Sequence, residues 1–119
     1  MAVKTYSLKE HGNTKLSTNF TVKEFACKDG SDKVLIDTAL VDVLQKIRDY
    51  FGKPVIINSA YRSPEHNKRV GGSAGSYHVK GMAADIQIAG VSAVELAYYA
   101  QTITNGVGVY YYGNTNFIH

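Results

Sequence analysis

The stretch Ser59–Asp85 reads SAYRSPEHNKRVGGSAGSYHVKGMAAD and holds most of the side chains in this chain that are suited to chemistry. It contains an arginine, Arg62, a glycine-rich loop, and a histidine, His78, that is followed seven residues later by an aspartate. We interpret the rest of the chain as a scaffold for this stretch. One distant residue, His119 at the end of the sequence, belongs to the same argument.

Length and composition indicate one globular domain. The chain has 119 residues, of which 45% are hydrophobic and 19% are charged, and a chain of this size has room for one core. No run approaches the roughly 18 apolar residues of a membrane span, and the N-terminus lacks the apolar segment of a secretory signal. We expect a monomer with no membrane partner, made up of an extended N-terminal arm (1–18) and a domain (19–119).

Charge and cysteine content narrow the classes of partner and site. The net charge of +3 favours an anionic partner only weakly, and the tyrosine clusters lack interleaved basic residues, so we expect no nucleic-acid binding. The single cysteine, Cys27, excludes an intramolecular disulfide and a cysteine-rich zinc site. Its apolar neighbours predict a buried structural thiol.

Local patterns predict the scaffold in the first half of the chain. Thr21 and Glu24 have the spacing of a capping box for a short helix. Apolar residues spaced by three and four predict a helix from Asp37 to Phe51, with Asp37 as N-cap and Gly52 at the left-handed C-terminal position. A buried strand is expected next, at 55–58.

The second half alternates short helices and strands. Ser63 and Pro64 are typical of a helix start, and a glycine-rich loop at 71–76 follows without the Gly-Lys-Ser/Thr of a nucleotide-binding loop. Strands are expected at 83–88 and 107–112, with a returning strand at 117–119, and a helix begins at about Ser92. The predicted class is α+β, with a small, mainly antiparallel sheet and helices packed on one side.

Three side chains in this arrangement suit zinc. Zinc is bound by imidazole nitrogen and carboxylate oxygen, and catalytic sites commonly combine three protein ligands with water. His78, Asp85 and His119 supply such a set if the last strand lies beside the strand at 83–88. Spacing alone leaves open the alternative of hydrogen-bonded histidines and an aspartate that serves a turn.

Two motifs resemble a known family. The segment Ser76–Asp85 matches S-x-H-x-x-G-x-A-x-D, and Ser59–Arg62 matches S-x-Y-R. Both are similar to the motifs of zinc D-Ala-D-Ala carboxypeptidases and related phage endolysin peptidases, in their short branch, and the similarity runs from about residue 16 onward. The resemblance implies the fold shared by hedgehog and D-Ala-D-Ala peptidases.

The resemblance also implies roles for individual residues. His78, Asp85 and His119 would be the ligands of Zn²⁺, and Arg62 would hold a substrate carboxylate or the developing oxyanion. The implied activity is hydrolysis of amide bonds in peptidoglycan stem peptides, as a D,D-carboxypeptidase or an endopeptidase. The protein would be made in the cytoplasm and act at the bacterial cell wall, as phage or prophage lysins do.

Three further residues of the motifs receive structural or substrate-binding roles. Ser76 would support the substrate side of the site, and Gly81 would let the chain turn sharply between two ligands. For Tyr61, packing and substrate stacking both stay open.

The sequence departs from the family pattern at the expected catalytic base. Asn116 occupies the position of an acidic residue, the chain ends at His119 where relatives continue, and Glu95 is the only acidic residue after Asp85. Three explanations remain open. The chain is a truncated product of a longer protein. Alternatively, the terminal carboxylate of His119 approaches the zinc or serves as a poor base. In the third explanation, the domain is a catalytically silent module that binds zinc and cell-wall peptide. We expect Glu65 and His66, on the short helix, to face solvent.

Overall fold

The predicted α+β class is confirmed by a computed structural model, which describes residues 3–72, 75–103 and 117–118. The elements in chain order are β1 (Val3–Ser7), α1 (Leu8–His11), β2 (Lys15–Ser17), β3 (Phe20–Thr21), the 3-10 turn η1 (Val22–Phe25), β4 (Lys33–Asp37), α2 (Thr38–Phe51), β5 (Ile56–Ser59), α3 (Pro64–Arg69), β6 (Asp85–Gln87), α4 (Ala93–Ile103) and β7 (Phe117–Ile118). The predicted strand at 107–112 lies outside the described residues.

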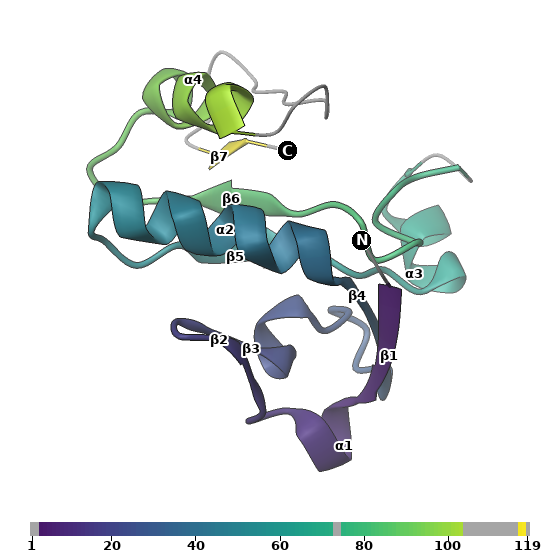
Figure 1. Ribbon diagram of the computed structural model, residues 1–119. Coiled ribbons are helices and arrows are strands. Elements are labelled where there is room, and N and C mark those ends of the chain that lie inside the picture. The colour runs from purple at the N-terminus through teal and green to yellow at the C-terminus, as the bar shows by residue number, and fades with distance from the viewer. Residues whose placement is uncertain (1–2, 73–74, 104–116, 119) are drawn as a thin grey trace.

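Helix α2 lies across the middle of the molecule, with β5 and β6 behind it, α4 on one side and β1 to β4 on the other (Figure 1). The Asp37 carboxylate caps it by accepting a hydrogen bond from the Ala39 amide at 2.9 Å. At its other end Gly52 is left-handed, with φ of 64°. Leu44 and Ile47 are buried on its inner face. The predicted helix and both of its end signals are confirmed.

Antiparallel pairing is also confirmed, although it is divided among three small sheets rather than one. These sheets pair β1 with β4, β2 with β3, and β5 with β6 and then β7. In the third sheet Ser59 lies opposite Asp85, and Ile86 lies opposite both Ile57 and Ile118. This register brings both halves of the predicted site to the same end of the sheet.

The N-terminal segment, which we expected to be an extended arm laid over the domain, contains β1, α1 and β2. Strand β1 pairs along the whole of β4, from Val3 opposite Asp37 to Ser7 opposite Lys33. The Asp32 carboxylate accepts hydrogen bonds from the Lys9 amide and the Ser7 hydroxyl, each at 2.8 Å, and the bond from the Lys9 amide is the main cause that lowers the pKa of Asp32. Strand β4 was not predicted from the sequence, because its apolar residues run directly into the α2 pattern.

The shorter predicted signals also have structural counterparts. The Glu24 carboxylate accepts a hydrogen bond from the Thr21 amide at 2.7 Å, as expected for a capping box. Ser63 caps α3 by accepting a hydrogen bond from the His66 amide at 3.2 Å, with Pro64 in the first helical turn.

In the part of the chain that the structure describes, no helix combines the length and apolar character needed to cross a membrane.

The glycine between the two predicted ligands has a special backbone. Gly81 has φ of 76°, and a Cβ built on it would lie 2.5 Å from the Leu35 carbonyl oxygen. Its own carbonyl accepts a hydrogen bond from the Asp37 amide at 2.9 Å. The turn is therefore pressed against the end of β4 and the start of α2, and only glycine fits there.

We predict that Gly81→Ala is much more destabilising than Gly71→Ala. Gly71 has a similar φ of 79°, but a Cβ at this position would have no atom of the described residues within 4 Å, so its substitution costs only the left-handed conformation, roughly 1–2 kcal/mol. Gly81→Ala adds a collision with backbone, which typically costs about 1–3 kcal/mol more. Chemical denaturation of the two variants measures the difference, and equal losses would contradict the close packing of Gly81.

Candidate metal and substrate site

Two segments of the chain form the site, one at the end of β5 and the other leading into β6. The Arg62 amide donates a hydrogen bond to the His78 carbonyl at 3.1 Å. Strand pairing places Ser59 opposite Asp85. Because these contacts are made by backbone, the positions of the two motifs relative to each other are set by the fold and not by flexible side chains.

His78 is the most deeply buried residue of the site, with 1% of its surface exposed. Its Nδ1 lies 2.7 Å from the Ala60 carbonyl oxygen. A carbonyl oxygen can only accept a hydrogen bond, so Nδ1 carries the proton. In the neutral ring Nε2 then has a lone pair, which is the arrangement of a histidine that binds a metal through Nε2.

Asp85 lies on the Nε2 side of this histidine. Its Oδ1 is 3.4 Å from His78 Nε2, and its side chain is 13% exposed. Two ligands bound to one zinc ion at about 2.0–2.2 Å with tetrahedral angles are separated by roughly 3.3–3.5 Å. The spacing of these two atoms therefore fits a shared zinc ion.

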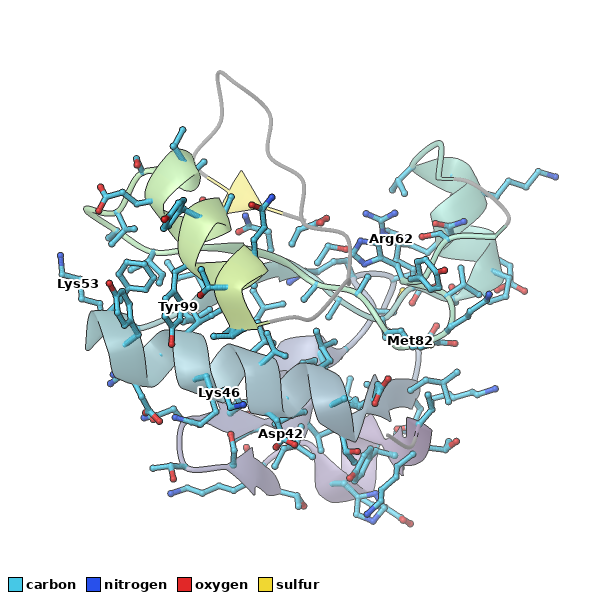
Figure 2. All side chains as sticks on the ribbon, turned by 45° about the horizontal axis from the view of Figure 1, so that its top comes forward. Asp42, Lys46, Lys53, Arg62, Met82 and Tyr99 are labelled. Atoms are coloured by element: carbon cyan, nitrogen blue, oxygen red, sulfur yellow. The ribbon has the colours of Figure 1, made fainter. Side chains whose placement is uncertain are left out.

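Arg62 faces the other oxygen of the same carboxylate. Its Nη2 lies 3.5 Å from Asp85 Oδ2, and its side chain is 18% exposed. Nε donates to the Ser59 hydroxyl at 3.2 Å, and Nη1 donates to Asn67 Oδ1 at 3.3 Å. Each of the three guanidinium nitrogens has a partner, so the orientation of the charged group is defined. Figure 2 shows Arg62 beside α3, at the opposite end of the molecule from Lys53 and Tyr99.

Asn67 is a site residue that the sequence analysis missed. It lies on α3 and is 2% exposed, and its Oδ1 receives the hydrogen bond from Arg62. A Cβ on Gly72 would collide with the Asn67 side chain, and the Gly72 amide donates to the Asn67 carbonyl at 2.8 Å. The available signal was a polar side chain within a helix of only six residues.

The two predicted substrate-binding residues have different surroundings. Ser76 is half-buried, and its hydroxyl accepts a hydrogen bond from the His78 amide at 3.2 Å. Tyr61 is only 5% exposed and belongs to the core, where burial raises the pKa of its phenol. This position favours packing over substrate stacking. His119 and Asn116 lie outside the described residues.

Comparisons with known proteins agree with the resemblance drawn from the motifs. The profile of a family described as Peptidase M15 matches residues 18–119. The peptidoglycan L,D-endopeptidase MepK of Escherichia coli K12 is 36% identical over 91 residues, which cover 71% of this chain and 50% of that protein. A probable peptidoglycan L,D-endopeptidase MepK of Haemophilus influenzae is 50% identical over 44 residues, covering 37% of this chain and 23% of the relative. No solved structure matches.

We predict that the neutral form of His78 carries its proton on Nδ1. The contact with the Ala60 carbonyl requires this tautomer. Nitrogen-15 NMR of the side-chain imidazoles distinguishes the two ring nitrogens, and His78→Ala assigns the signal. A proton found on Nε2 would contradict the proposed orientation of the lone pair.

We also predict that Gly72→Ala destabilises the protein by about 1–3 kcal/mol, because the added methyl group overpacks Asn67. The same substitution in an Asn67→Ala background should cost less, since the colliding amide is gone. A double-mutant cycle measured by denaturation gives the coupling between the two residues. Additive losses would show that Gly72 is not required by Asn67.

Proposed function

Because this chain belongs to the peptidase M15 family, we propose that it is a zinc-dependent peptidase that hydrolyses amide bonds in peptidoglycan stem peptides. The observation that carries the proposal is the Asp85 carboxylate, which presents one oxygen to buried His78 and the other to Arg62. This arrangement combines two side chains that are able to bind a metal ion with a cation of fixed orientation. The chain spans about half the length of the E. coli relative. The activity named for that relative is therefore assigned to this chain only as a proposal.

The proposed zinc ligands are His78, Asp85 and His119. The first two are supported by their spacing and by the hydrogen bond that orients the imidazole. The third is supported by strand register, because Ile118 in β7 lies opposite Ile86, the residue that follows Asp85. When bound, the zinc ion would polarise the scissile carbonyl and activate water.

The proposed role of Arg62 is to bind negative charge on the substrate. A guanidinium donates two parallel hydrogen bonds to a carboxylate or an oxyanion, and here its direction is fixed by Ser59 and Asn67. In the overall reaction water adds to the carbonyl carbon, the carbon–nitrogen bond breaks, and the leaving amine takes up a proton. Arg62 lies beside Asp85, so its guanidinium would be close to the negative charge that develops on the carbonyl oxygen when water adds.

We propose endopeptidase rather than carboxypeptidase activity. The two relatives are named as L,D-endopeptidases, so an L,D bond within the stem peptide is the first candidate. Asn116 stands where the resembled peptidases have an acidic catalytic base. This difference favours one alternative, a module that binds zinc and cell-wall peptide without cleaving it. In either case the site of action would be the bacterial cell wall.

Digestion of purified peptidoglycan with and without a chelator, followed by mass spectrometry of the fragments, tests the proposal. We expect new peptide termini only in the presence of zinc. His78→Ala should lose activity together with the zinc ion bound at this site. Arg62→Lys should keep zinc but lose about 10²–10³-fold in rate, the typical effect of removing one oxyanion donor.

Arg48→Lys, on α2 outside the site, is the matched control for Arg62→Lys. Zinc binding and muropeptide binding without any new termini would identify the module instead of the enzyme. A parent protein that takes up no zinc when prepared without chelator would rule out both the enzyme and the module.

A further inference from the structure

A second group of metal-ligating side chains lies outside the site described above. Cys27 and Asp29 lie in the loop after η1, and His66 lies on α3. One ligand atom from each residue, a sulfur, a carboxylate oxygen and a ring nitrogen, lies within 4.8 Å of the other two. His66 is far from both other residues along the chain, so only the fold brings the three together.

Backbone and hydroxyl contacts of Ser63 hold this group in place. The Ser63 amide donates to the Cys27 sulfur at 3.3 Å, and its hydroxyl donates to Asp29 Oδ2 at 2.6 Å. The same hydroxyl accepts a hydrogen bond from the His66 amide at 3.2 Å. One residue therefore contacts all three members, through the side chains of Cys27 and Asp29 and through the backbone of His66.

The three side chains are at the edge of the core. Cys27 is 4% exposed, the Asp29 side chain is 13% exposed, and His66 is half-buried and not simply facing solvent as expected from the sequence. Hydrogen bonds from Ser31, followed by that from Ser63, hold the pKa of Asp29 well below its usual range.

The combination of donors selects a class of metal. Calcium and magnesium prefer oxygen ligands throughout, whereas thiolate, imidazole and carboxylate together suit zinc and similar transition metals. Ligand atoms around a tetrahedral zinc ion are separated by roughly 3.3–3.6 Å. The present separations, up to 4.8 Å, would need to close by about one ångström, which side-chain rotation can supply.

One cation already lies near this group. Arg69 Nη2 is 3.8 Å from Asp29 Oδ2, but the Arg69 side chain is 64% exposed. An exposed ion pair of this kind contributes little to stability. A divalent ion can therefore displace the guanidinium, which is able to turn into solvent.

We propose that Cys27, Asp29 and His66 form a second zinc site, separate from the site at His78 and Asp85. An ion there joins the loop at 27–29 to α3. The same helix contains Asn67, which contacts Arg62. An ion at the second site would therefore help to fix the position of the helix residue that orients Arg62. This inference does not depend on whether the protein cleaves peptidoglycan.

Cobalt(II) is a direct probe because Cys27 is the only cysteine in the chain. Thiolate-to-cobalt charge transfer produces near-ultraviolet absorption, so such a band can arise only from this residue. We expect the band in the parent protein and in His78→Ala, which empties the other proposed site. We expect no band in Cys27→Ser.

Zinc content gives the second readout. In the His78→Ala background, about one equivalent of zinc should remain, and His66→Gln should lower its affinity at least about tenfold, since even indirect partners of a ligand contribute that much. Arg69→Gln, which removes the competing cation, should bind as tightly as the parent or more tightly. Circular dichroism checks that each variant is folded.

Absence of the charge-transfer band in the folded parent protein at saturating cobalt would overturn the proposal. So would a band in the parent protein that His66→Gln leaves unchanged, because the sulfur would then bind metal without the other ligands. If Cys27→Ser fails to fold, the His66→Gln titration still decides. Loss of peptidase activity plays no part in either readout, so this site and the proposed function can fail independently.

Discussion

The hydrogen bond between His78 Nδ1 and the Ala60 carbonyl is the interaction on which the site depends. It is short, 2.7 Å, and its imidazole is almost fully buried, so leaving either partner without a hydrogen bond would cost about 1–3 kcal/mol. Together with the bond from the Arg62 amide to the His78 carbonyl, it joins the two motif segments. It also determines which nitrogen of the ring faces Asp85.

Gly81 connects this site to the scaffold formed by β4 and α2. The Gly81 carbonyl accepts a hydrogen bond from the Asp37 amide, and Asp37 in turn caps α2, the helix across the middle of the molecule. The turn between His78 and Asp85 is thereby fixed to the end of β4. Strand β1 pairs with β4 along its length. The N-terminal segment therefore stabilises the strand against which the Gly81 turn packs.

Helix α3 is short, yet it makes two separate sets of polar contacts. Asn67 contacts Arg62 and through it the Asp85 carboxylate. Ser63 at its start and His66 within it contact or approach the loop that contains Cys27 and Asp29. A helix of six residues has little stability of its own. Its position is consequently determined by these two sets of contacts, and the proposed second zinc site would strengthen one of them.

The sequence by itself determined the local features and the family of the chain. The ends of α2, the cap of α3 and the turn at Gly81 were predictable because each depends on residues a few positions apart, and the spacing of His78 and Asp85 carried the family resemblance. The pairing of β1 with β4, the contact of Asn67 with Arg62, and the approach of His66 to Cys27 were decided only by the tertiary structure. These contacts join residues whose partners are set by the packing of whole elements against one core, and no local pattern of side chains records that packing.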